Sequence, residues 1–258
     1  MMQHGARHSS LGSRAARVFL MCAVGVFASP VAPAAWAQAA GPAAPARMSA
    51  AGPARPAGAA AEVVRWNREA FDLYEAGQTE RALSLYMKAA ARGDPSARYN
   101  VAVIRLRDDS RRPSLATAIG HLRASAQAGF APAQLMLGAL LESGRHVTAS
   151  QSEATAWFAK AAEQGLVDAQ LSLATQYYLG RGVAQDYAAA ARWYLAAAEG
   201  GDVAAQYMAA SMLATGLGVQ RNLREALQWY TAAARQGDIA AREQARVLTE
   251  RLAREQES

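Results

Sequence analysis

Few residues of this chain have the types and spacing that metal binding requires. The chain has 258 residues, of which four are histidine and one is cysteine. A protein metal site needs several nitrogen, sulfur or carboxylate ligands that converge on one point. His121 and His146 are accompanied by neither cysteines nor a matching pattern of carboxylates. We interpret each histidine as a substitution that the fold tolerates, without a role in metal binding. The sequence therefore predicts no metal site and no cofactor.

The residues that could bind phosphate or act as nucleophiles are similarly sparse. Gly180 and Gly182 resemble part of a phosphate-binding loop, but they follow an expected helix rather than a strand, and the third glycine is missing. We interpret them as a turn. The two lysines, Lys88 and Lys160, are expected on solvated helix positions. These observations predict that the chain is not an enzyme.

One charged segment stands apart from the rest of the sequence. Asp108 and Asp109 are followed closely by Arg111, Arg112 and Pro113. Loops carry binding functions more often than packed helices do, so this segment could dock a charged partner. The alternative is an irregular solvated loop, and the sequence leaves both open.

Residues 1–37 have the order of a secretory signal peptide. Three arginines precede an apolar run over residues 18–28, and a small-x-small site follows at Ala35-Trp36-Ala37. The apolar run is too short to span a bilayer, which takes about 20 residues. We therefore expect cleavage after Ala37, no stable membrane insertion, and a periplasmic or secreted protein. Cleavage would also remove Cys22 and leave no thiol for a disulfide.

Composition and charge limit the other classes of function. The formal net charge is +6, but three arginines and no acidic residue lie within residues 1–37. The small remaining excess does not favour nucleic acid as a partner. Residues 38–61 consist mostly of alanine, glycine and proline, which bury too little apolar surface to fold. We predict a disordered linker there and a folded domain over residues 62–254.

A repeat of 36 residues organises that domain. Five glycines recur at this interval, and an alanine stands four residues after each of them. The glycines are Gly93, Gly129, Gly165, Gly201 and Gly237. Such a period indicates that stacked copies of one supersecondary unit bury a shared core.

Each unit reads as two helices, A and B. In helix B, an alanine, an aromatic pair such as Trp193-Tyr194 and two further alanines lie at i, i+3, i+4, i+7 and i+8, on one helix stripe. A polar residue suited to capping precedes the helix (Asp186, Asn222, and Ser150 or Ser152), and a glycine follows it. We expect both aromatics of each pair to be core residues between units. The pattern predicts an all-α fold, a right-handed α-solenoid of antiparallel helix pairs, with roughly five pairs and a polar C-terminal capping helix.

The detailed motif resembles the Sel-one-like repeat (SLR) family of the tetratricopeptide-repeat superfamily. The best match runs from Tyr177-Tyr178-Leu179-Gly180-Arg181-Gly182-Val183 through Asp186, Trp193-Tyr194 and Gly200-Gly201. One unit earlier the loop is Gly144-Arg145-His146-Val147, with one glycine lost, so its shape should differ.

The resemblance implies a protein that binds other proteins. Penicillin-interacting and β-lactamase-like activity is attributed to cysteine-rich members, yet this chain contains no Ser-x-x-Lys sequence. We therefore expect an exported non-catalytic scaffold that binds a protein or peptide partner through the concave face of the solenoid. The alternative is a cell-wall or β-lactam-interacting protein with weak hydrolase activity.

The resemblance also places helix A on the concave side. In one A helix, Ala169, Leu173 and Tyr177 are expected to pack in the core, which leaves a second stripe on the same helix. The predicted partner-binding residues on this stripe and its neighbours are Leu135, Leu171, Thr175, Tyr178, Tyr207 and Ser211. The alternative is that they only fill the contact between adjacent A helices.

Overall fold

The described part of the chain is entirely helical. The structure, a computed structural model, describes residues 58–107 and 112–257, and no strand occurs in these ranges. The helices are α2 (Ala59–Glu75), α3 (Thr79–Ala91), α4 (Pro95–Arg107), α5 (Arg112–Gln127), α6 (Ala131–Ser143), α7 (Gln151–Glu163), α8 (Val167–Leu179), α9 (Tyr187–Glu199), α10 (Val203–Thr215), α11 (Leu223–Arg235) and α12 (Ile239–Glu257). The predicted signal peptide and most of the predicted linker lie outside the described residues. Helix α2 begins before residue 62, so residues 59–61 are helical.

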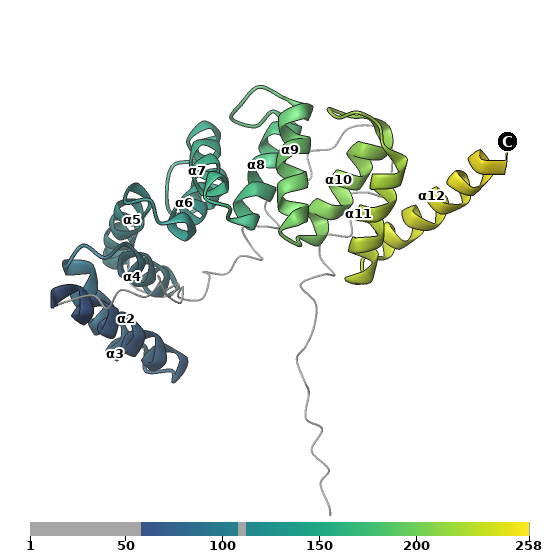
Figure 1. Ribbon diagram of the computed structural model, residues 1–258. Helices are drawn as coiled ribbons and strands as arrows, with labels where there is room; N and C mark the ends of the chain where they lie inside the picture. The colour runs from purple at the N-terminus through teal and green to yellow at the C-terminus, as the bar shows by residue number, and fades with distance from the viewer. Residues whose placement is uncertain (1–57, 108–111, 258) are drawn as a thin grey trace, which may run out of the picture.

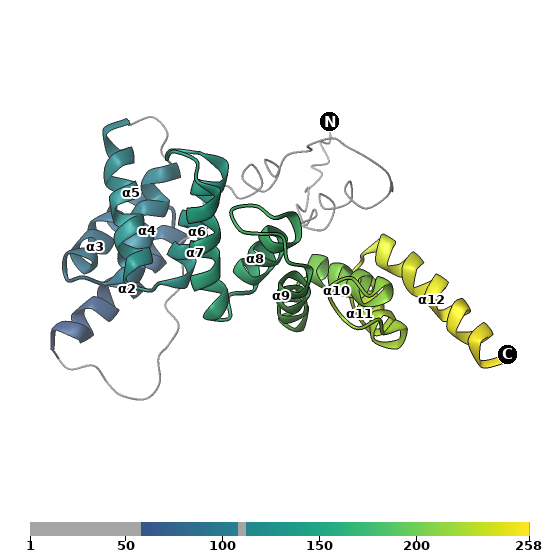
Figure 2. The same cartoon turned by 90° about the horizontal axis from the view of Figure 1, so that it is seen from above.

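Consecutive helices pack as pairs, and each pair packs on the next. The five pairs are α2 with α3, α4 with α5, α6 with α7, α8 with α9, and α10 with α11, and α12 packs on α11. We number these pairs as units one to five and call their first and second members helix A and helix B. Figure 1 shows the units following one another along an arch, and Figure 2 shows α12 projecting at its C-terminal end. The predicted α-solenoid of helix pairs is confirmed.

The ends of the B helices follow the predicted signals. The Asp186 carboxylate accepts hydrogen bonds from the backbone N–H groups of Ala188 and Ala189, both at 2.9 Å. The Asn222 side chain accepts one from Glu225 N–H at 3.1 Å. Of the two serine candidates in unit three, Ser150 is the capping residue. The glycines after these helices have left-handed backbones, with φ of 82° at Gly165, 90° at Gly201 and 99° at Gly237.

The two members of each aromatic pair occupy different environments. The second member is a core residue, with 1% of Phe158, 3% of Tyr194 and 4% of Tyr230 exposed. The first member, Trp157, Trp193 or Trp229, is only half-buried. Trp193 contacts the apolar clusters on both sides of it, as expected for a residue between units. The prediction that both aromatics are core residues is wrong for the tryptophans, which pack against the apolar clusters but remain partly exposed.

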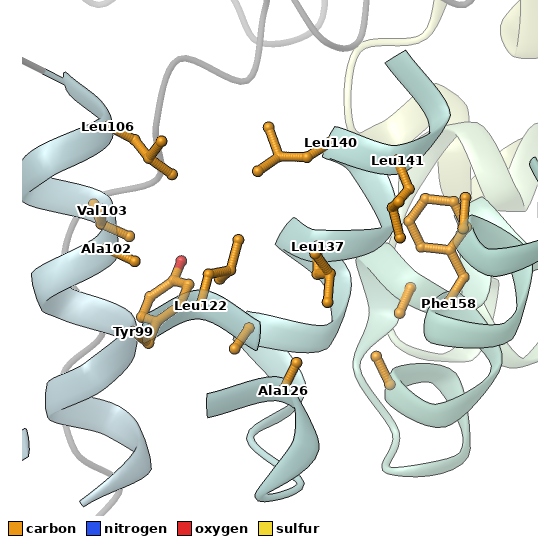
Figure 3. Close-up of a cluster of buried hydrophobic side chains, with 14 of the residues drawn as sticks. Tyr99, Ala102, Val103, Leu106, Leu122, Ala126, Leu137, Leu140, Leu141 and Phe158 are labelled. Atoms are coloured by element: carbon orange, nitrogen blue, oxygen red, sulfur yellow. The ribbon is translucent and has the colours of Figure 1, made fainter. Parts of the chain in front are cut away.

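The core is continuous from unit to unit. In Figure 3, Tyr99 of α4 lies beside Leu122 of α5, and Leu137 of α6 lies between them and Phe158 of α7. Each unit therefore buries its apolar stripe against the next one, as the repeat predicts.

Helix α12 has the polar character predicted for a terminal helix. Arg246 forms ion pairs with Glu243, at 2.6 Å, and with Glu250. Ala241 and Leu248 are buried against α11, whereas Ile239 is 62% exposed.

Candidate partner-binding surface

Contacts between neighbouring units determine which face of an A helix remains open. In α8, the Gln176 side chain is buried and donates to Glu142 Oε1 of α6, at 2.8 Å. Leu173 and Ala174 are buried in the apolar clusters. These contacts cover the sides of α8 that face the neighbouring helices. One further stripe of residues along α8 stays partly exposed to solvent.

The residues of this stripe are spaced i, i+4, i+7 and i+11 along the A helix, so they lie on one helix face. In α8, Asp168 and Leu179 are exposed at its two ends, and Ser172 and Thr175 are partly exposed between them. The repeat places equivalent residues on α6 and α10. We call the whole set the A-face stripe: Pro132, Met136, Ala139, Ser143, Asp168, Ser172, Thr175, Leu179, Ala204, Met208, Ser211 and Thr215.

The structure brings two of the predicted binding residues, Thr175 and Ser211, onto the A-face stripe. Leu171 is corrected to a core position, because only 5% of it is exposed and it packs in the cluster of units four and five. Leu135 is half-buried against the preceding cluster. The hydroxyl of Thr175 donates to the Leu171 carbonyl at 2.9 Å and lies 3.2 Å from the Tyr194 hydroxyl.

The two predicted tyrosines pack against the B helix of their own unit. Tyr178 meets Tyr187 edge-on, with ring centroids 5.4 Å apart. Tyr207 meets Tyr230 in the same way at 5.3 Å. Both tyrosines are half-buried, so part of each ring reaches solvent. Their role in partner binding remains a prediction.

Sequence reasoning missed a set of glutamines that join the units. Three of them recur at the repeat interval on the A helices and donate to a carbonyl near the end of the preceding B helix. They are Gln134, Gln170 and Gln206. Gln164 and Gln236 donate in turn to the side-chain oxygens of Gln134, at 2.7 Å, and Gln206, at 2.9 Å. Each of these carbonyls also accepts a hydrogen bond from the backbone N–H of the glycine after the helix, so the glutamine supplies a second one. The recurrence of the glutamines at the repeat interval was their signal in the sequence.

The residues considered for chemistry are dispersed over the surface of the solenoid. His121 is half-buried on α5, where burial, followed by the charges of Arg105 and Arg98, lowers its pKa. His146 lies in the loop after α6 and accepts a hydrogen bond from Arg145 at 3.0 Å. No group of three or more histidine, cysteine or acidic residues that could hold a metal ion occurs in the described ranges.

The two lysines and the glycine turn that the sequence singles out lie on helices or in a loop, and the structure describes part of the charged segment. The Lys160 ammonium lies 4.1 Å from the centre of the Trp157 ring, and Lys88 is exposed. Gly180 ends α8 with a left-handed backbone, in agreement with a turn. Residues 108–111 of the charged segment lie outside the described residues, and Arg112 and Pro113 belong to α5. Within residues 58–107 and 112–257, none of the helices combines the length and hydropathy of a membrane span.

Comparisons with known proteins agree with this geometry. A family model described as Sel1 repeat matches residues 70–94, 131–166, 167–202 and 203–238. A Sel1 repeat protein from Oxalobacter formigenes is similar, with 28% identity and a TM-score of 0.60, over 72% of this chain and 76% of that one. A protective antigen from uropathogenic Escherichia coli strains, which displays an SLR fold, has 28% identity and a TM-score of 0.64. That match covers 75% of this chain and 46% of the antigen, so this chain spans less than half its length. No curated protein sequence gives a significant match.

Proposed function

Because the chain belongs to the Sel1 repeat family, we propose that it is an exported, non-catalytic scaffold that holds a protein or peptide partner on its A helices. Sel1 repeat proteins generally mediate protein–protein interaction. The observation that supports this site is the A-face stripe, which continues across α6, α8 and α10 with partly exposed side chains.

The chemistry of the A-face stripe suits a peptide or a folded protein surface. Met136 and Met208 offer flexible apolar contacts, and methionine adapts readily to different partners. Ser172, Thr175 and Ser211 add hydroxyl groups beside them. A mixed apolar and polar strip of this kind is typical of non-obligate interfaces.

Charges placed on the A-face stripe should weaken partner binding. The partner is first identified by crosslinking in cells and mass spectrometry, and its affinity is then measured by calorimetry. Substituting Ser172→Glu and Ser211→Glu should reduce affinity by about tenfold or more, because the added carboxylates must lose water at the interface. The free energy of unfolding should change by less than about 0.5 kcal/mol per site.

A matched control places the same charges on the B helices, at the exposed positions Ala156→Glu and Gln228→Glu. These changes should leave affinity unaltered. Equal losses in both variants, or no loss in either, would exclude the A-face stripe as the binding surface. Turnover of a β-lactam probe by the wild-type protein would contradict the non-catalytic assignment and favour the cell-wall alternative.

Export should leave a mature protein that begins at Gln38. The prediction depends on the basic, apolar and small-residue order of residues 1–37. Mass spectrometry of the protein from the periplasm or culture medium measures its N-terminus. An Ala37→Arg variant should accumulate as an uncleaved precursor, because the cleavage site needs a small residue there. A full-length wild-type product in the cytoplasm would refute export.

A further inference from the structure

Unit two departs from units three to five at several aligned positions, among them three that carry basic side chains. The family model matches residues on either side of it but not residues 95–130. The repeat has no insertions between units, so the aligned residues can be read directly. They are Arg98 where later units have Gln134, Gln170 and Gln206; Arg105 where they have Leu141, Tyr177 and Leu213; and His121 where they have Trp157, Trp193 and Trp229.

In the later units these three positions lie on an A helix and a B helix of one unit, and that A helix also packs on the preceding B helix. The glutamine reaches the end of the preceding B helix, as Gln134 does with the Ala126 carbonyl at 3.1 Å. The tryptophan lies against the clusters of both units, as Trp193 does, and Tyr177 also belongs to both. In these units the junction is therefore filled by apolar or neutral side chains.

In unit two the same junction carries cationic groups. The Arg105 guanidinium reaches α3, with Nη2 at 4.0 Å from the Met87 sulfur. Both Arg98 and Arg105 act electrostatically on His121 of α5. All three side chains are half-buried. We call Arg98, Arg105 and His121 the cationic junction.

The described residues leave the charge of this junction uncompensated. In the described ranges three arginines form ion pairs with acidic residues: Arg92 with Glu62 at 3.8 Å, Arg246 with Glu243 and Glu250, and Arg251 with Glu255 at 3.0 Å. Within the described ranges no carboxylate forms an ion pair with Arg98 or Arg105, and none contributes to the electrostatics of His121. Partly desolvated guanidinium groups without a counter-charge are costly, and a bound carboxylate would remove that cost.

We propose that the cationic junction binds the carboxylates of an acidic segment of a partner protein, an inference that depends on the proposed scaffold function. The two guanidinium groups supply forked N–H donors that suit carboxylate oxygens, and an N–H group of the His121 imidazole adds a further donor. The junction is confined to one meeting point of α3, α4 and α5. Nucleic acid would need a longer basic strip to follow its phosphates, so an acidic peptide fits better.

The test uses the full-length mature protein and a fluorescein-labelled oligoglutamate peptide, followed by fluorescence anisotropy at low and physiological salt. An oligoglutamine peptide of equal length is the neutral comparison. The informative variant is Arg98→Gln, Arg105→Leu and His121→Trp together, which installs the residues of unit three and should therefore fold. A variant with Arg68→Gln and Arg242→Gln removes two exposed charges elsewhere.

Wild-type protein should bind oligoglutamate more tightly than oligoglutamine, and the triple variant should lose about tenfold or more in affinity. The control variant should lose less than about twofold, as distant screened charges do. Equal affinity of wild type and triple variant would overturn the inference and leave the scaffold function intact, since capture on the A-face stripe tests that function separately. An oligonucleotide that binds more tightly than oligoglutamate, with the same loss in the triple variant, would also overturn it.

Discussion

Replacing Gly182 with alanine should lower the free energy of unfolding by about 3 kcal/mol or more, measured by urea denaturation. Gly182 has φ of 70°, a region that costs an L-residue roughly 1 to 2 kcal/mol. A Cβ atom at this position would also lie 2.3 Å from the Gln151 carbonyl oxygen at the start of α7. The loop of unit four would have to move away from unit three to relieve that contact.

The Gly165→Ala variant separates the cost of the left-handed backbone from the cost of the steric contact. Gly165 has φ of 82°, but a Cβ atom there meets nothing within 4 Å. This variant should lower the free energy of unfolding only by the cost of the left-handed backbone, roughly 1 to 2 kcal/mol. If Gly182→Ala cost no more than Gly165→Ala, the close approach of the loop to α7 would not contribute to stability.

The period and the helix ends could be predicted from sequence because local residues determine them. Glycines with left-handed backbones and capping residues such as Asp186 act within one turn of a helix. Their recurrence at a fixed interval then implies the stack of pairs. No longer-range information was needed for the fold class.

The rotation of the A helices could not be predicted in the same way. Apolar residues at i, i+4 and i+7 form several stripes around α8, and the sequence does not say which stripe its neighbours cover. Leu171 is covered by units four and five, whereas Ser172, one position later, is partly exposed. The buried Gln176 was the available signal, because a glutamine bonded to the preceding A helix fixes the orientation of α8.

Gly182, the second glycine of the loop after α8, is needed because of a tertiary contact with α7. The sequence identifies Gly180 and Gly182 as a turn, but only the structure places Gly182 against Gln151. In the preceding unit His146 occupies the equivalent position with φ of 64°. Its backbone there is close to that of Gly182, and Gly144 and Gly180 begin the two loops with φ of 69° and 66°. The predicted difference in loop shape is therefore wrong. Both loops also close with the same backbone hydrogen bond, from Ser150 N–H to the Leu141 carbonyl at 2.9 Å and from Asp186 N–H to the Tyr177 carbonyl at 3.0 Å.

The second large effect is expected for Phe158→Ala, which should lower the free energy of unfolding by about 3 to 5 kcal/mol. Phe158 is 1% exposed and joins the cluster that links units two, three and four. Its ring also covers Gly138 of α6, where a Cβ atom would lie 2.6 Å from Phe158 Cε1. Truncation therefore leaves a cavity beside a glycine that has no side chain to fill it.

Trp157→Ala is the matched control, since this larger residue precedes Phe158 in the same helix. Trp157 is half-buried and has Lys160 over its ring, so its truncation should cost roughly 1 to 2 kcal/mol. The test is which of the two variants loses more free energy of unfolding, because residue size alone would predict the larger loss for tryptophan. A greater loss for Trp157→Ala in urea denaturation would mean that the first aromatic of each pair, and not the second, holds the units together.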